Sequence, residues 1–150
     1  MFKRILIPTD GSKPSEHAAR VGVDLAAAIG GTVIAFYVVD KGRILEDIDI
    51  SGIELSKEVL DGARLGLQKE GRIATEYIEK LARASGVNIQ TKVDIGSPAE
   101  AILKSADENQ MDAIVMGSKG KTGLSKVLLG SVAEKVVRNS KIPVVIVPTS

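Results

Sequence analysis

The residues with the clearest chemical signature lie between Gly117 and Ser131, where four glycines fall within fourteen positions and a serine follows the last one. Glycine tolerates positive φ and lets the backbone approach a ligand closely. Clustered backbone N–H groups ahead of a helix attract anions, and phosphate is the usual one. The spacing therefore indicates a phosphate-binding loop, and the alternative is a flexible connection between a strand and a helix.

Two familiar phosphate motifs do not fit this loop. Gly120-Lys121-Thr122 resembles the end of a P-loop, but that motif needs another glycine at position 115, where Val115 stands inside an expected strand. The dinucleotide fingerprint belongs after the first strand, and only Gly11 is found there. A phosphate loop in this chain must therefore be of a different kind.

Other polar residues could act beside the loop. Asp10 ends the first apolar run, where its carboxylate can accept hydrogen bonds from a nucleoside, or it is a helix cap or turn residue. Lys119 and Lys121 either offset phosphate charge or are solvated loop lysines. His17, the single histidine, is expected on a helix surface. No general base with an orienting partner is evident, so efficient hydrolysis is not expected.

Hydrophobic periodicity predicts the elements that position these residues. Short apolar runs predict strands at 2–8, 32–39, 88–95, 112–117 and 142–147. Helical spacing predicts helices at 12–29, 53–85, from 97 onward and at 131–139, with a loop at 40–52. The same spacing puts Leu25 on the buried face of the first helix. Ser97, Pro98 and Glu100 are typical of a capping box. Gly62, Gly66 and Gly71 indicate that the second helix begins late or contains a break, because glycine disfavours helices.

This alternation predicts an α/β three-layer sandwich with a five-stranded parallel sheet in the order 3-2-1-4-5, a Rossmann-like fold. The chain length of 150 residues suits one domain over 1–150. In this order the chain reverses direction between the first and fourth strands. Ligands of open α/β sheets bind at such a point, beyond the carboxyl ends of the strands. Asp10 and the glycine loop both follow these two strands.

Composition excludes several classes of function. Lys and Arg number 20 against 19 Asp and Glu, and aromatic residues make up 3%, which argues against a nucleic-acid partner. The absence of cysteine removes disulfides, thiolate metal sites and a cysteine nucleophile. The N-terminal region lacks an apolar stretch long enough for a secretory signal or a membrane span. A cytoplasmic protein without a membrane partner is expected.

The pattern Gly117-x2-Gly120-x9-Gly130-Ser131 resembles the nucleotide-binding signature of the universal stress protein family, in its ATP-binding subgroup. Four further segments are also similar to that family, so the resemblance spans the chain. They are ILIPTDGS, YVVD, VMGSKGKTGLSKVLLGSVAEKVV and IPVVIVP. The resemblance implies binding of ATP, with Mg²⁺ or Mn²⁺ on its phosphates. The implied site comprises Pro8, Thr9, Asp10, Val38, Met116, Gly117, Ser118, Gly120, Lys121, Gly130 and Ser131.

The same resemblance implies a sensor or signalling module of the stress response, with at most slow hydrolysis and an unknown signalling partner. It also implies a homodimer through the last strand, whose residues are Val144, Val145, Ile146 and Val147. An uncharged edge strand invites such pairing. Two alternatives stay open: a structural or chaperone-like dimer that needs no nucleotide, and an enzyme that uses an adenine nucleotide. The intact glycine pattern argues against the first alternative. The second lacks an SGG-type loop after the first strand.

Overall fold

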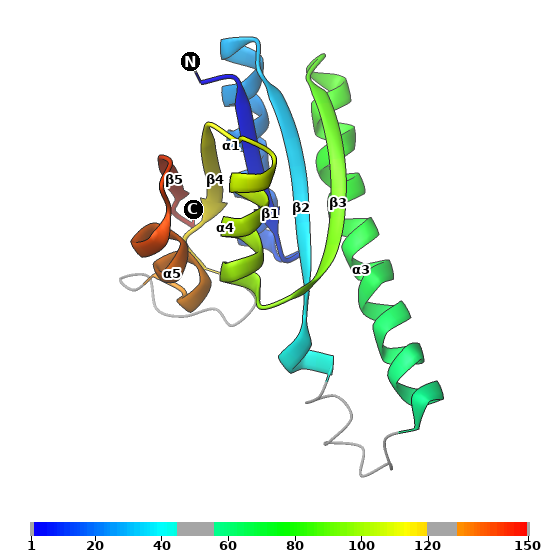
Figure 1. Ribbon diagram of the computed structural model, residues 1–150. Coiled ribbons are helices and arrows are strands. Elements are labelled where there is room, and N and C mark those ends of the chain that lie inside the picture. The colour runs from blue at the N-terminus through cyan, green and yellow to red at the C-terminus, as the bar shows by residue number, and fades with distance from the viewer. Residues whose placement is uncertain (1, 45–55, 120–128, 150) are drawn as a thin grey trace.

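The computed structural model describes residues 2–44, 56–119 and 129–149 (Figure 1). Strands and helices alternate along this part of the chain. Their bounds are β1 Arg4–Thr9, α1 Lys13–Ile29, β2 Thr32–Asp40, α3 Lys57–Ala84, β3 Asn88–Gly96, α4 Pro98–Glu108, β4 Ala113–Gly117, α5 Ser131–Asn139 and β5 Val144–Val147.

The five strands form one parallel sheet in the order β3-β2-β1-β4-β5, as predicted. β1 lies at the centre and pairs with β2 along its whole length, with Arg4 opposite Thr32 and Thr9 opposite Tyr37. On its other side β1 pairs with β4. Because all strands run in the same direction, Thr9 and Gly117 bring the loops that follow them to the same edge of the sheet.

Helices cover both faces of the sheet, which gives the predicted three layers (Figure 1). Successive strand residues point to opposite faces. Ile5 and Ile7 pack in the core beneath α1 and α3, whereas Leu6 lies in the second core with residues of α4 and α5. All three side chains are fully buried, and so is Phe36 of β2.

α3 is one continuous helix, so the suspected break is absent from Lys57–Ala84. Its N-cap is Ser56, whose hydroxyl accepts a hydrogen bond from the N–H of Val59. A Cβ at position 71 would lie 2.7 Å from Cδ1 of Tyr37, so Gly71 lets the helix approach the sheet. Gly62 and Gly66 have no such neighbour within 4 Å. The helix forms because its packed face outweighs the low helix propensity of glycine.

Three other local predictions are wrong. Asp40 is the last residue of β2 and residues 41–44 are helical, so the predicted loop is not present there; residues 45–52 lie outside the described ranges. The Ser97 side chain makes no cap hydrogen bond, although α4 does begin at Pro98. Leu25 of α1, placed on the buried face by its spacing, is 36% exposed, and Val23 takes that place in the core.

In the part of the chain that is described, no helix has both the length and the apolar character that crossing a membrane requires.

Candidate functional site

A cavity of about 270 Å³ opens at the carboxyl edge of the sheet, between the ends of β1, β2 and β4 and the start of α5. This is the point where the strand order reverses, which is the usual place for a ligand in an open α/β sheet. Its lining residues are Pro8, Thr9, Asp10, Ser15, Phe36, Tyr37, Val38, Asp40, Arg43, Pro98, Ile102, Met116, Gly117, Ser118, Lys119, Gly130, Ser131, Val132 and Ala133.

Part of the cavity wall is apolar and packed. Phe36, Ile102 and Met116 contribute to this wall and belong to the core shared with α4 and α5. Each is at most 6% exposed. Because their positions are fixed by core packing, they form a preformed surface suited to a flat apolar ring.

The polar part of the wall is the N-terminus of α5. Gly130 is the N-cap, so no side chain there satisfies the backbone N–H groups of the first turn. Ser131, Val132 and Ala133 of that turn all line the cavity. Unpaired N–H groups and the positive end of the helix dipole attract an anion. Ser131 is thus the first residue of the helix and not its N-cap.

The loop after β4 is held against α5 and β5 by its backbone. Gly130 N donates a hydrogen bond to the carbonyl oxygen of Ser118 over 2.7 Å, and Ser118 N donates to the carbonyl oxygen of Val147 over 3.0 Å. A Cβ at Gly117 would lie 3.3 Å from the carbonyl oxygens of Pro14 and Lys119. Gly117 therefore permits the tight packing of this loop on the first turn of α1.

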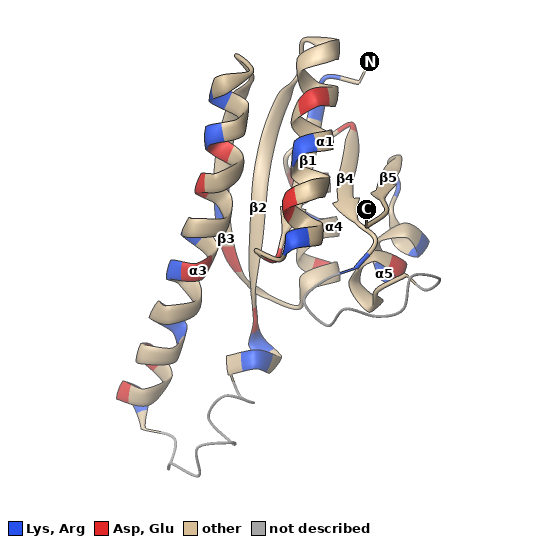
Figure 2. Ribbon diagram, turned by 180° about the vertical axis from the view of Figure 1, so that it is seen from behind, with Lys and Arg blue, Asp and Glu red and all other residues tan. Residues whose placement is uncertain are grey.

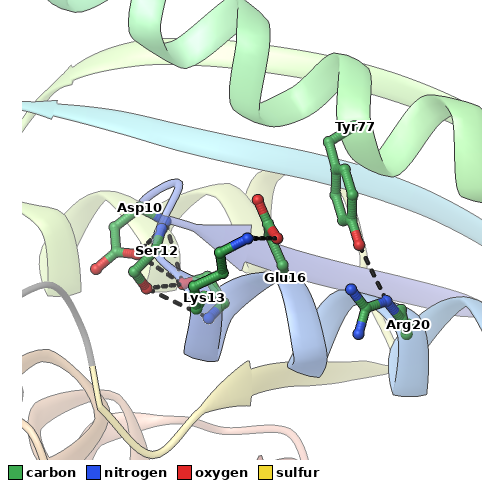
Figure 3. Close-up of polar contacts among 7 residues, drawn as sticks. Asp10, Ser12, Lys13, Glu16, Arg20 and Tyr77 are labelled. Carbon is green, nitrogen blue, oxygen red and sulfur yellow. Dashed lines mark hydrogen bonds and ion pairs between the residues drawn. The ribbon is translucent and has the colours of Figure 1, made fainter.

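Asp10 is held in a turn at the end of β1 (Figure 3). Its Oδ1 atom accepts a hydrogen bond from Ser12 N over 2.9 Å and from the Ser15 hydroxyl over 2.7 Å. Ser12 is also the N-cap of α1, where its side chain accepts a bond from Ser15 N. The turn role considered for Asp10 is therefore present, and it fixes the half-buried carboxylate where it lines the cavity.

Lys119 lines the same cavity and is only 8% exposed. None of the ion pairs formed within residues 2–44, 56–119 and 129–149 involves this lysine. The ammonium group of a lysine that lines a cavity attracts an anion placed in that cavity. Lys119 is thus not a solvated loop lysine, and its environment favours an anionic ligand.

A third group of polar residues borders the cavity near the end of β2. Tyr37 and Arg43 line it, and both approach Glu70 of α3. The Tyr37 hydroxyl lies 3.5 Å from Oε2 of Glu70, and an Arg43 guanidinium nitrogen lies 3.9 Å from the same oxygen. Burial, reinforced by the negative charge of Glu70, raises the pKa of Tyr37 above its ordinary value. Tyr37 therefore stays protonated at neutral pH.

The structure brings most of the predicted residues to this one cavity. Pro8, Thr9, Asp10, Val38, Met116, Gly117, Ser118, Gly130 and Ser131 all line it. Gly120 and Lys121 lie outside the described residues. His17 is half-buried on α1 and is not among the lining residues. Among the described residues, no group of three or more acidic or histidine side chains is arranged to hold a metal ion.

Sequence reasoning missed several lining residues, chiefly Ser15, Tyr37, Arg43 and Ile102. Ser15 lies five positions after Asp10, within the first turn of the predicted helix, and that spacing was an available signal. Tyr37 lies one position before Val38 on the same strand. Arg43 falls in the predicted loop at 40–52 and Ile102 in the predicted helix from residue 97 onward, so nothing in the local pattern indicated that either one borders a ligand.

Comparison with known proteins gives consistent matches over the whole chain. The model of the universal stress protein family matches residues 1–148. The universal stress protein MJ0531 of Methanocaldococcus jannaschii is 40% identical over 98% of this chain and 82% of its own length. YxiE, a universal stress protein of Bacillus subtilis, is 34% identical, over 98% of this chain and 99% of its own.

Solved structures agree with these matches. The structure of protein MJ0577, which is 32% identical, superposes with a TM-score of 0.82 and covers all of this chain and 98% of that one. A universal stress protein in complex with cAMP is 27% identical, with a TM-score of 0.69, and covers 99% of this chain and 98% of that one.

Proposed function

The chain belongs to the universal stress protein family, and from that premise we propose that its cavity binds ATP as a regulatory ligand. The observation that carries this proposal is the meeting of an apolar wall, an uncapped helix N-terminus and a buried lysine in one cavity. A nucleotide has groups complementary to these features: a flat ring suits the apolar wall, and a chain of phosphates suits the helix N-terminus and the lysine.

In this proposal the ligand extends from the apolar wall of the cavity to its polar wall. The adenine lies against the apolar wall, with the backbone of Val38 at its edge and Met116 beside it. Asp10 accepts hydrogen bonds from the ribose, with Pro8 and Thr9 adjacent. The phosphates lie over the first turn of α5 and near Lys119, where N–H groups and the ammonium group offset their charge.

The cAMP complex of a similar protein supports an adenine nucleotide as the class of ligand. ATP is the finer proposal. The choice of ATP depends on the glycine pattern from Gly117 to Ser131 and on the positive charge and N–H groups around the phosphate region. A triphosphate gains more binding free energy than a monophosphate from Lys119 and the α5 N-terminus, because it carries more negative charge.

The residues present suit a nucleotide-borne metal ion. The phosphate region contains N–H donors and a lysine, and metal ions with oxygen ligands are commonly held by substrate phosphates with few protein groups. Mg²⁺ or Mn²⁺ is therefore proposed to arrive with the phosphates, whose charge it partly neutralises. Asp10 and Ser131 are two of the residues with side-chain oxygens that line the cavity.

We infer a sensing role in which occupancy of the cavity is read by an unknown signalling partner. Hydrolysis is expected to be slow, because Asp10, the carboxylate that Ser15 orients in the cavity, is proposed to bind the ribose and not to activate a water molecule. A turnover near 1 per second or faster, at the low end of ordinary enzymes, would contradict this role. The alternatives remain a nucleotide-independent dimer and an adenine-nucleotide enzyme.

Pairing of two chains through β5 is part of the proposal. β5 is an edge strand, so one side of its backbone has no neighbour within the sheet. Val145 is 39% exposed, and Val144 and Ile146 are half-buried. Two such strands meeting across a two-fold axis would cover one another's apolar side chains and exposed edges.

Gly130→Val tests the site directly. The valine side chain would stand at the α5 N-cap, where the phosphates are proposed to lie, so ATP affinity should fall below detection in a calorimetric titration. Gly62→Val is the matched control, because Gly62 lies on α3 in open space. ATP bound by Gly130→Val with unchanged affinity would contradict the site, provided that circular dichroism shows both variants folded.

A further inference from the structure

The outward face of α3 carries the two most exposed large apolar side chains among the described residues. Leu65 is 65% exposed and Ile73 is 60% exposed. The core face of the helix points the other way, with Leu67, Gly71, Ala74 and Ile78 buried against the sheet. A partner that covered these two side chains would gain free energy by burying their apolar surface.

Charges are arranged symmetrically around Leu65. Glu58 and Asp61 lie seven and four positions before it, and Arg72 and Lys69 lie seven and four positions after it. At 3.6 residues per turn these positions fall within about 40° of Leu65 around the helix axis. One stripe along the helix is therefore formed by five residues, and we call it the α3 stripe: Glu58, Asp61, Leu65, Lys69 and Arg72.

The four charged residues of the α3 stripe are all exposed. None takes part in the ion pairs found among the described residues, although α4 and α5 each form one between neighbouring turns. Figure 2 shows both signs of charge along α3. Within the α3 stripe the acids precede Leu65 and the bases follow it, whereas Glu76, also exposed on this side of the helix, lies one turn beyond Arg72 and outside the stripe. The stripe is therefore complementary to a copy of itself that runs in the opposite direction.

The surroundings of the stripe leave room for such a copy. In Figures 1 and 2 the N-terminal half of α3 extends past the carboxyl edge of the sheet. Gly62 and Gly66 flank Leu65, and a Cβ at either position would meet nothing within 4 Å. A second helix can therefore approach closely beside Leu65, and no contact with residues 2–44, 56–119 or 129–149 accounts for these two glycines.

We propose that a second copy of this chain docks on the α3 stripe as an antiparallel helix pair. A two-fold axis at Leu65 sets Leu65 against its equivalent, Glu58 opposite Arg72 and Asp61 opposite Lys69. α3 packs on β2 and β3, at the opposite end of the strand order from β5. Pairing through the stripe is thus compatible with pairing through β5. One helix pair buries less area than a standard interface of roughly 1,600 Å², so dissociation in the micromolar range is expected.

The absence of cysteine makes a cross-linking experiment specific. Leu65→Cys places one thiol at the proposed two-fold axis. Mild oxidation of about 50 μM protein should give a disulfide-linked dimer on a non-reducing gel. Leu25→Cys on α1, also an exposed leucine, is the matched control and should react at least tenfold more slowly. Equal rates for the two variants would overturn the proposal.

A charge exchange tests the register. In the Leu65→Cys background, Arg72→Glu sets like charges opposite each other and should slow cross-linking at least fivefold. Adding Glu58→Arg restores opposite charges and should restore the rate. A double variant that stays as slow as Arg72→Glu would contradict antiparallel pairing at this register. Circular dichroism checks that each variant is folded, and no step depends on nucleotide binding.

Discussion

The hydroxyl of Ser15, on the first turn of α1, donates a 2.7 Å hydrogen bond to Oδ1 of Asp10 at the end of β1. Ser15 is 6% exposed, so its position is fixed by packing. Its oxygen also accepts bonds from Asp10 N and from the Ser12 hydroxyl. The sheet and the helix are thus joined at the cavity, and Ser15 orients the carboxylate that is proposed to bind ribose.

Ser15→Ala should lower ATP affinity, because Asp10 loses the bond that holds its carboxylate in place. The expected loss is about three- to tenfold, equivalent to about 1 kcal/mol, which is typical of one hydrogen bond. Isothermal titration of both proteins with ATP measures it. Ser56→Ala is the control: it removes a helix-capping hydroxyl at α3 and should cost similar stability without changing affinity. Equal affinity of wild type and Ser15→Ala would refute the orienting role.

Lys119→Met should affect stability and binding in opposite directions. The free energy of unfolding without ligand should stay the same or rise, because a largely buried side chain that forms no ion pair among the described residues is replaced by an apolar one of similar length. ATP affinity should fall at least tenfold, since a charge-assisted contact to phosphate is lost. Urea denaturation and calorimetry measure the two quantities.

A titration with adenosine distinguishes the loss of a phosphate contact from a general disturbance of the cavity. Its affinity should change by less than twofold in Lys119→Met, because adenosine has no phosphate. A parallel loss of adenosine and ATP affinity would mean that Lys119 supports the cavity as a whole.

Two glycines of α3 should respond oppositely to alanine. Gly71→Ala should lower the free energy of unfolding by about 1–3 kcal/mol, because its Cβ would lie 2.7 Å from Tyr37 and 2.9 Å from Val93. Gly66→Ala should raise it by up to about 1 kcal/mol, because its Cβ meets nothing and alanine favours helix. Thermal and urea denaturation of both variants provide the comparison. A stabilising Gly71→Ala would show that the helix does not pack this closely on β2 and β3.

Asp112 should give the protein an acid-sensitive contact between β1 and β4. Its Oδ2 accepts bonds from the backbone N–H groups of Lys3 and Arg4 at 2.9 and 2.8 Å, and these bonds lower the pKa of Asp112. A pKa lowered on folding means that the ionised carboxylate stabilises the fold above its unfolded pKa of about 4. This stabilisation is lost as the pH falls through the lower, folded pKa.

Asp112→Asn should therefore be less stable than wild type by about 1 kcal/mol at pH 7. The difference should begin to shrink below pH 4, where the carboxyl group of the unfolded wild type takes up a proton, and should be lost once the pH is also below the lower, folded pKa. Urea denaturation of both proteins across this pH range tests the expectation. A difference that stays constant down to pH 2 would rule out the titration of Asp112 as its cause.

The layers and strand order were predictable because every buried strand is a short apolar run between helical segments. Local details were less predictable where two effects compete. Gly71 weakens a helix in isolation, yet it is the residue that allows α3 to reach Tyr37. Ser97 has the sequence of a capping box, but its side chain makes no cap bond. Tertiary contacts decide such cases, and a single sequence does not display them.

The same limit applies to the cavity. Asp10 and Gly130 were identifiable because they directly follow or precede a predicted element at the switch point. The sequence left Lys119 as either a residue that offsets phosphate charge or a solvated loop lysine, and only the fold reveals that it is buried in the cavity wall. Arg43 joins the cavity because residues 41–44 are helical, which the polar sequence after β2 did not indicate.

Mass spectrometry of the small molecules released when the purified protein is denatured tests nucleotide binding most directly. The proposed function predicts adenine nucleotide, with ATP the main species, at a substantial fraction of one equivalent per chain, and none from Gly130→Val. Protein that releases no nucleotide, and that also fails to bind added ATP with Mg²⁺ in a calorimetric titration, would contradict the assignment of this cavity.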